Sequence, residues 1–231
     1  MDEPKNLKAS VRYNSDSHLV YNNVLNQLEC YWRYVDDINN KSIIYRRTSK
    51  DGVNWTVKEV SLINNPRNKK DCVSPSIIFE DNIYKMWYVD KGNTLKYATS
   101  TDGITWGNIK KLEIMYEKPL QTWHLDVIST SKGYEMVVVA FDKWANHNDM
   151  SLYYTKSTDG FIWDTAKEIV RPTINTNNWD NKGIYRSSFV YENDNYYVFY
   201  SGTNKKYNHG IGLVYGNDIN NLREATIDII N

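Results

Sequence analysis

The stretch Ser49-Lys50-Asp51-Gly52-Val53-Asn54-Trp55 recurs as Ser100-Thr101-Asp102-Gly103-Ile104-Thr105-Trp106 and as Ser157-Thr158-Asp159-Gly160-Phe161-Ile162-Trp163. Successive aspartates are 51 and 57 residues apart, and a decayed fourth copy, Gly216-Asn217-Asp218-Ile219-Asn220-Asn221-Leu222, follows after 59 residues. A fixed period in this range indicates that one supersecondary unit is repeated along the chain.

The repeated heptapeptide, called the Asp-Gly motif below, is typical of a turn between two strands. Glycine adopts positive φ at little cost, so Asp-Gly between β-rich runs predicts a hairpin. The Asp and Ser side chains can hydrogen-bond nearby backbone groups and hold the turn closed. The Trp can then fold back as an apolar plug over the end of its own sheet. We therefore assign Asp51, Asp102, Asp159 and their Trp partners a structural role.

Composition and charge exclude several classes of protein. The 231 residues carry 28 Lys+Arg against 28 Asp+Glu, so there is no basic footprint for nucleic acid. No apolar run is long enough to span a membrane as a helix. Residues 1–5 lack the charged and apolar leader of a secretion signal. Cys30 and Cys72 lie in different repeats, which favours a buried free pair over a disulfide or a metal site.

Each repeat is predicted to form four short strands, and no useful segment shows helical periodicity. Four-stranded units at this period are typical of the blades of a β-propeller, which are separate sheets around a central channel. We predict an all-β fold, one propeller domain over residues 1–231 with four blades at 15–60, 73–113, 123–170 and 185–230. The outermost strands are expected at 55–60, 106–113, 163–170 and 224–230, and residues 1–14 could add one strand.

A resemblance to known propellers rests on two stretches of the second repeat. Ser-Pro-Ser-Ile-Ile-Phe-Glu-Asp-Asn-Ile-Tyr-Lys-Met-Trp-Tyr-Val (Ser74 to Val89), followed by Tyr97 to Trp106, is similar to the five-bladed propellers of family 43 and family 32 glycoside hydrolases. The likeness extends from about Asn14 to Leu222. Such propellers also resemble receptor-binding modules in phage tail proteins, and the Asp-Gly motif resembles an Asp-box. The resemblance implies that the four blades are part of, or derived from, a five-bladed ring.

The first strand of each predicted blade lines the channel, and alternate residues face one side of a strand. Aligning these four strands gives equivalent pairs, Asp16/His18, Ser74/Ser76, His124/Asp126 and Arg186/Ser188. Charged groups in a confined channel are usually paired or functional. The alignment therefore predicts a polar cluster at one mouth of the channel.

Three interpretations of this cluster stay open. Asp16, Asp126 and Arg186 could form a structural ion-pair network that closes the ring. The cluster could instead be a sugar site, because hydroxyl-rich ligands need paired donors and acceptors. A metal site on His18 and His124 follows no zinc spacing, so neither a metal nor a cofactor is predicted. No motif supports a nucleophilic Ser or Cys.

Hydrolysis of a glycosidic bond needs an acid and a base or nucleophile. The resemblance to family 43 implies three carboxylates from different blades, with Asp16 as base or nucleophile and Asp126 as the residue that tunes or assists. The third carboxylate is unmatched, because Glu29 and Glu117 lie outside the predicted first strands. Arg186 and the imidazoles are expected to hold both aspartates ionised, which suits binding better than proton donation.

Aromatic side chains supply flat apolar faces with a polar edge for stacking on sugars. Trp123 abuts His124 and is predicted to contact the ligand, as are Trp144 and Trp179 in loops. The stretch Lys143 to Asp149 is predicted to be a long rim loop in which His147 is solvated.

We predict that the chain recognises a glycan at the channel mouth, as a phage tail or cell-surface adhesin module. The predicted binding residues are His18, Ser74, Ser76, Trp123, His124 and Arg186. One alternative is a glycoside hydrolase using Asp16 and Asp126, and another is a structural or assembly module with an inert channel. The expected partner is an oligosaccharide, not nucleic acid or a membrane. An extracellular, cell-surface or virion location fits this role.

Overall fold

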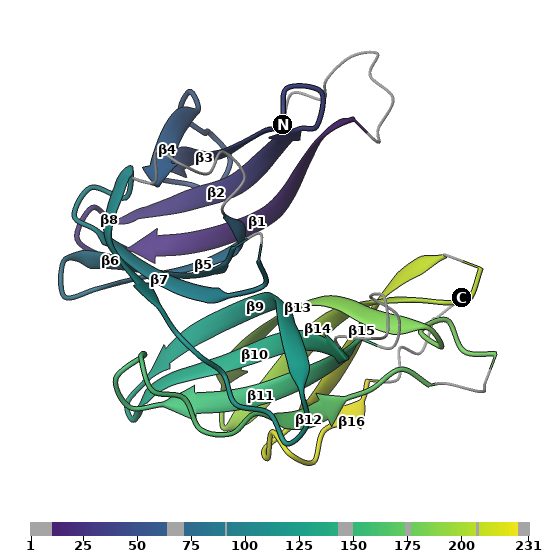
Figure 1. Ribbon diagram of the computed structural model, residues 1–231. Helices are drawn as coiled ribbons and strands as arrows, with labels where there is room; N and C mark the ends of the chain where they lie inside the picture. The colour runs from purple at the N-terminus through teal and green to yellow at the C-terminus, as the bar shows by residue number, and fades with distance from the viewer. Residues whose placement is uncertain are drawn as a thin grey trace. The chain divides into compact units, whose positions relative to one another are not determined.

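The computed structural model describes residues 11–63, 72–90, 92–142, 150–173, 177–206 and 208–225, and these ranges contain strands and no helix. The chain divides into two compact units, Met1–Leu112 (unit 1) and Glu113–Asn231 (unit 2). They run from purple to teal and from teal to yellow in Figure 1. Each unit is described by itself.

Each unit contains two blades of four consecutive antiparallel strands. The first blade is β1 (Arg12–Asn22), β2 (Gln27–Asp36), β3 (Lys41–Ser49) and β4 (Glu59–Ile63). The second is β5 (Val73–Glu80), β6 (Ile83–Val89), β7 (Leu95–Ser100) and β8 (Thr105–Lys111). The third is β9 (Leu120–Thr130), β10 (Gly133–Asp142), β11 (Ser151–Ser157) and β12 (Lys167–Val170). The fourth is β13 (Gly183–Glu192), β14 (Asn195–Thr203), β15 (His209–Gly216) and β16 (Arg223–Glu224). The predicted all-β fold and the four blades are confirmed.

The outermost strands depart from the prediction. β4 begins at Glu59 because Trp55 stays at the turn, where its indole N–H donates to the Gly52 carbonyl at 3.1 Å. β12 begins at Lys167 and β16 comprises Arg223–Glu224, while residues 226–230 lie outside the described residues. Residues 12–14, predicted for a separate strand, belong to β1.

Separate sheets are the wrong prediction for unit 1. Its two blades join at their outer edges, where Leu62 pairs in parallel with Thr105 and Ile63 with Trp106. The result is one eight-stranded sheet in the order β1-β2-β3-β4-β8-β7-β6-β5. Parallel pairing is available because both outer strands follow an Asp-Gly motif and run in the same direction. In unit 2 the two blades are separate four-stranded sheets.

The Asp-Gly motif closes its turn as predicted. In the second copy, Asp102 Oδ1 accepts the backbone N–H groups of Ile104 and Thr105, both at 2.8 Å. Ser100 Oγ accepts the Gly103 N–H at 2.9 Å, and Gly103 has a φ of 70°. These bonds satisfy backbone donors that would otherwise be open to solvent at a tight turn.

The motif tryptophans differ in burial. Trp106 is 1% exposed, Trp163 is 5% exposed, and Trp55 is only half-buried. Trp106 does more than cover its own blade, because its indole N–H donates to Ser61 Oγ of the first blade at 2.7 Å. It also meets the ring of Tyr31 edge-on with a centroid separation of 6.4 Å. This Trp therefore joins the two blades of unit 1.

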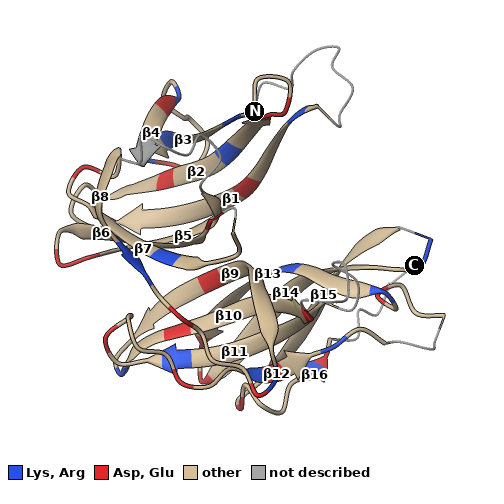
Figure 2. Cartoon of the chain, in the orientation of Figure 1, with Lys and Arg blue, Asp and Glu red and all other residues tan. Residues whose placement is uncertain are grey.

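Each unit has its own apolar core, built from the inward face of its strands. The core of unit 1 includes Val20, Tyr31, Met86 and Trp106, and that of unit 2 includes Val137, Leu152, Ile184 and Phe189. Neither Cys30 nor Cys72 forms a disulfide within the described residues; Cys72 is buried as predicted, whereas Cys30 is only half-buried. Charged residues of both signs occur on both units in Figure 2. Among the described residues no helix is long and apolar enough to cross a membrane.

Candidate functional site

The first strand of every blade contains a β-bulge near the predicted site positions. The register with the second strand shifts between Ser15 and His18 in β1 and between Val73 and Ser76 in β5. Equivalent shifts occur opposite Val139 in β9 and at Tyr185 in β13. A bulge re-aims side chains and is frequent next to functional sites. The predicted site residues therefore lie at a shared irregularity of the fold.

Asp16 is buried at the first bulge and has a φ of 56°. Its Oδ2 atom pairs with Arg33 Nη1 of β2 at 3.0 Å, and both side chains are largely removed from water. Left-handed backbone is sparsely populated for residues other than glycine, and such strain clusters at functional sites. The ion pair favours the ionised carboxylate. Arg33 was missed by the sequence analysis because it enters from the neighbouring strand, opposite Ser15.

Ser74 and Ser76, the predicted site residues of the second blade, are fully buried on β5. Ser74 shares the left-handed backbone of Asp16, with a φ of 50°. His18 of β1 forms a hydrogen bond between its Nε2 and the Ile77 carbonyl of β5 at 2.9 Å. The first strands of the two blades are thus in contact within unit 1, as the repeat predicts.

Unit 2 brings together an acid, an imidazole and aromatic rings. His124 is 3% exposed on β9, and its ring meets Trp123 at 5.3 Å and Tyr185 at 4.7 Å, both edge-on. Tyr185 is 44% exposed, so the buried imidazole lies under a ring that reaches solvent. Arg186 follows Tyr185 on β13 and is half-buried.

Asp126 accepts three hydrogen bonds in this group. Its Oδ2 atom accepts the Ser188 hydroxyl at 2.8 Å and the Phe189 backbone N–H at 3.2 Å, and its Oδ1 accepts the Val127 N–H at 3.1 Å. The bonds link the first strands β9 and β13, at the positions that the sequence alignment treats as equivalent.

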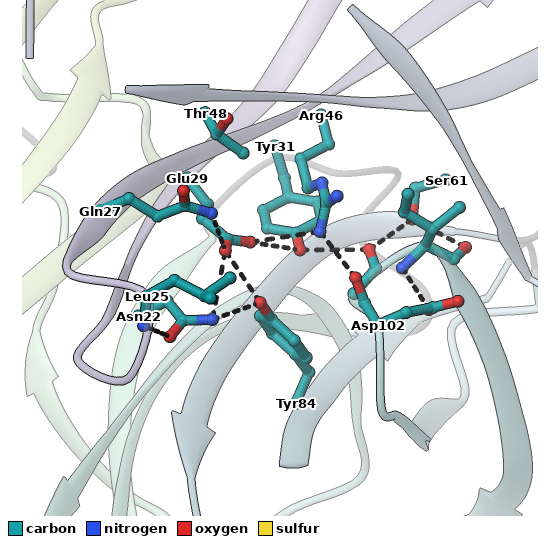
Figure 3. A network of polar contacts seen from close by, with 12 residues as sticks. Asn22, Leu25, Gln27, Glu29, Tyr31, Arg46, Thr48, Ser61, Tyr84 and Asp102 are labelled. Atoms are coloured by element: carbon teal, nitrogen blue, oxygen red, sulfur yellow. Dashed lines mark hydrogen bonds and ion pairs between the residues drawn. The ribbon is translucent and has the colours of Figure 1, made fainter. Parts of the chain in front are cut away.

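A second buried network, shown in Figure 3, surrounds Glu29 of β2, which is 0% exposed. Five side chains donate to its carboxylate. They are Asn22 at 3.4 Å, Gln27 at 3.0 Å, Tyr31 at 3.0 Å, Tyr84 at 2.8 Å and Arg46 at 3.5 Å. Arg46 Nη1 also donates to the Asp102 carbonyl at 2.7 Å, and so ties the network to the Asp-Gly motif of the second blade.

The electrostatics of the Glu29 network follow from burial. Burial, with the hydrogen bond and the charge of Glu29 added, raises the pKa of Tyr84 to about 12. Burial, with the charge of Glu29 added, also raises the pKa of Tyr31, against the opposing charge and hydrogen bond of Arg46. Both phenols therefore remain protonated donors near neutral pH. Every donor has a protein acceptor, so this network is a structural element of unit 1.

The sequence predicts loop positions for three further residues, Trp144, His147 and Trp179. Trp144 and His147 of the predicted rim loop lie outside the described residues. Trp179 stacks on Tyr200 with a centroid separation of 5.6 Å and an interplanar angle of 20°. Within the ranges that the structure describes, no group of three His, Cys, Asp or Glu side chains could hold a metal ion.

Comparison with known proteins supports the class of fold that these blades define, a β-propeller like those of family 43 glycoside hydrolases. A thermostable family-43 glycoside hydrolase aligns with a TM-score of 0.66 at 13% identity, covering 95% of this chain and 74% of that one. An α-L-arabinofuranosidase from Clostridium thermocellum aligns with a TM-score of 0.65 at 16% identity, covering 91% and 71%. No family model matches the sequence.

Two comparisons give N-acetylgalactosamine deacetylases of one bacterium. The chain is 27% identical over 232 residues to an A type blood N-acetyl-α-D-galactosamine deacetylase from Flavonifractor plautii. The alignment covers 79% of this chain and 30% of that protein. The crystal structure of an N-acetylgalactosamine deacetylase from F. plautii with blood group B trisaccharide aligns with a TM-score of 0.75 at 24% identity, covering 85% of this chain and 64% of that one. This chain therefore spans about a third of the curated relative.

Proposed function

We propose that the chain acts on a saccharide, as the propeller of a hydrolytic carbohydrate-active enzyme. The observation that carries the proposal is the unit 2 group, in which the buried His124 lies between Trp123 and Tyr185, two residues before the hydrogen-bonded Asp126. Aromatic rings beside buried polar groups suit a sugar, which offers apolar faces and hydroxyls. The likeness to glycoside hydrolases and to a glycan deacetylase supports this class.

The geometry favours one type of hydrolysis over another. Cleavage of a glycosidic bond needs a protonated carboxylic acid beside an ionised carboxylate. Asp16 is paired with Arg33 and the Asp126 carboxylate accepts hydrogen bonds from Ser188, Phe189 and Val127, so both carboxylates are already engaged by partners within the protein. We therefore propose hydrolysis of the N-acetyl group of an amino sugar. Water attacks the acetyl carbonyl, the C–N bond breaks, the amine takes a proton and acetate leaves.

The residues take distinct roles in this proposal. His124 serves as the general base for water and then as the acid for the leaving amine, as an imidazole can near neutral pH. Asp126 acts as a positioning residue for the β9–β13 pair, while Trp123 and Tyr185 contact the sugar. Arg186 and the unit 1 residues Asp16, His18, Ser74 and Ser76 stay predicted contributors to saccharide binding.

A second candidate is recognition of a glycan without hydrolysis. It is favoured by the same observation that weighs against glycosidic cleavage, namely that Asp16 and Asp126 already have partners. Within this candidate, the five-bladed parent ring, the phage or cell-surface adhesin role and the inert assembly module stay predictions.

The test is a screen of the chain against chromogenic glycosides and oligosaccharides that end in N-acetylhexosamines, with acetate and reducing ends both measured. We expect acetate release that is lost in His124→Gln and strongly reduced in Asp126→Asn, with unchanged melting temperatures. Asp218→Asn, in an exposed turn of the decayed motif, is the control and should keep full activity. Reducing ends without acetate would establish a glycoside hydrolase, whereas saccharide binding with neither product would establish recognition alone.

A further inference from the structure

Glu29 in unit 1 and Glu135 in unit 2 occupy the same position of the repeat. The serine that opens the Asp-Gly motif pairs with Leu28 in the first blade and with Tyr134 in the third. Glu29 and Glu135 are the next residues on the second strands. Three residues before the same serine, Arg46 in β3 corresponds to Tyr154 in β11. In the neighbouring blades, Tyr84 pairs with Ser100 and Tyr196 with Gly216, so these tyrosines also correspond.

The surroundings of the two glutamates differ at almost every donor. The unit 1 donors Asn22, Gln27, Tyr31, Arg46 and Tyr84 correspond by register to Thr130, Gly133, Val137, Tyr154 and Tyr196. Glu135 keeps hydrogen bonds with the hydroxyls of Tyr154 and Tyr196. Its Oε2 atom is buried and has no hydrogen-bond partner among the described residues. A buried acceptor without a donor costs free energy, and more so when it is charged.

Glu135 also lines an open pocket, whereas Glu29 is sealed. The pocket has a volume of about 590 Å³ and is lined within unit 2 by Tyr134, Glu135, Tyr154 and Tyr196, with Lys132, Lys156, Asp159 and Asp164 among its other residues. The two lysines and the two aspartates balance, so Glu135 leaves the lining with one net negative charge. The lysines and aspartates are exposed.

The fourth Asp-Gly motif has lost the glycine that packs on the Glu29 network in unit 1. In unit 1 the motif of the second blade packs onto the Glu29 network, and a Cβ atom on Gly103 would lie 2.5 Å from the Tyr31 hydroxyl. The corresponding residue of the fourth blade is the buried Ile219. A residue with a Cβ atom cannot bring its backbone that close, and no residue of the fourth-blade turn is among those that line the pocket.

We infer that the Glu135 pocket binds the free amino group of an amino sugar, whose ammonium takes the place that the Arg46 guanidinium fills in unit 1. The ammonium supplies the donor that Glu135 Oε2 lacks, and the tyrosine rings offer faces for the sugar ring. The choice of a sugar as carrier rests on the proposed function, while the choice of a cation rests on the Glu29 comparison. The pocket is distinct from the His124 group. Thr130 lines the pocket and lies on the same strand as His124, and at the rise per residue of an extended strand the two residues are about 20 Å apart.

The experiment is a calorimetric or NMR titration of the chain with galactosamine and glucosamine, each compared with its N-acetyl form, below neutral pH where the amines are protonated. We expect the free amines to bind and the N-acetyl forms to bind roughly tenfold or more weakly, because a charge-assisted hydrogen bond is lost. Glu135→Gln should weaken amine binding by a similar factor. Glu224→Gln, on the exposed β16, is the matched control and should bind as the parent does.

Two outcomes overturn the inference. Equal binding of the amines and their N-acetyl forms would show that no cation is recognised. Unchanged amine binding in folded Glu135→Gln would show that the cation is bound elsewhere. Asp126→Asn separates this site from the proposed function, since it should strongly reduce acetate release and leave the amine titration unaltered.

Discussion

The two units use the same blade position in opposite ways. In unit 1, Glu29 is enclosed by five donor side chains and by the turn that contains Asp102 (Figure 3). In unit 2, Glu135 keeps two tyrosine hydroxyls and faces a pocket. The difference shows that a repeat can preserve its strands while a sealed network at one position is replaced by an open pocket at the equivalent position.

Backbone geometry explains why unit 2 has no donor equivalent to the Gln27 amide at this position. Gly133 replaces Gln27 and has a φ of 121°, where side chains are strained. A Cβ atom there would lie 2.3 Å from the Ser157 carbonyl oxygen. The backbone of the β9–β10 turn therefore excludes an amide donor from the pocket.

The largest expected effect comes from the motif tryptophans. Trp106→Ala should destabilise unit 1 by about 3–5 kcal/mol, because it opens a cavity and leaves Ser61 without its indole donor. Within the described residues the half-buried Trp55 donates only to Gly52 of its own turn, so Trp55→Ala should cost less than half as much. Urea unfolding of both variants measures the difference, and equal losses would mean that Trp106 does not join the blades.

The next effect separates the two glutamate positions directly. Among the described residues, Arg46 is the only positively charged partner of the fully buried Glu29 carboxylate. Arg46→Leu should therefore lower the free energy of unfolding by about 3 kcal/mol. The equivalent Tyr154→Leu removes a neutral hydroxyl rather than a charge from Glu135, which lines an open pocket, and should cost about 1 kcal/mol. Chemical denaturation of the two variants measures both losses of unfolding free energy. A similar cost for both variants would contradict the contrast between a sealed and an open site.

Alkaline pH should destabilise the folded protein by deprotonating Tyr84 and Tyr196, which occupy equivalent positions in the two units. Burial raises the pKa of each to about 12, from a usual value of 10. Folding therefore favours the protonated phenol, and this contribution is complete below pH 10 and is lost as the pH rises towards 12. Tyr84→Phe and Tyr196→Phe should each flatten the decline of the melting temperature in this window. A decline of unchanged slope in both variants would assign the alkaline transition to other groups.

The smallest effect concerns the turn of the second Asp-Gly motif. Backbone hydrogen bonds, with that of Thr105 the largest, lower the pKa of Asp102 to about 2. Its stabilising contribution is present above the usual pKa of 3.8 and is lost as the pH falls towards 2. Asp102→Asn should remove part of the acid sensitivity of the melting temperature. The effect is small because the carboxylate is exposed to solvent.

The sequence predicts the blades well because the Asp-Gly motif is local. Its turn needs only glycine at positive φ and a nearby Asp and Ser, so Asp51, Asp102 and Asp159 are recognisable without tertiary information. The alignment of first strands likewise identifies Asp126 and Ser188 as equivalent, and these residues contact each other.

The remaining features depend on pairing across strands. Arg33 meets Asp16 from the neighbouring strand, and Tyr185 covers His124 from the next blade, so no local spacing reveals them. The alignment of first strands does not include Glu29, because this fully buried residue lies on a second strand. The parallel joining of β4 to β8 pairs Leu62 with Thr105 and Ile63 with Trp106, residues far apart in the sequence, so no local pattern predicts it.

The most direct test of the account is Tyr154→Arg, which gives unit 2 the guanidinium that Arg46 provides in unit 1. The variant should keep or raise the free energy of unfolding, because Glu135 gains an internal cation, and it should lose binding of galactosamine and glucosamine in the calorimetric titration. Amine binding with an unchanged dissociation constant in the folded variant, or failure of the variant to fold, would contradict the equivalence of the two glutamate positions.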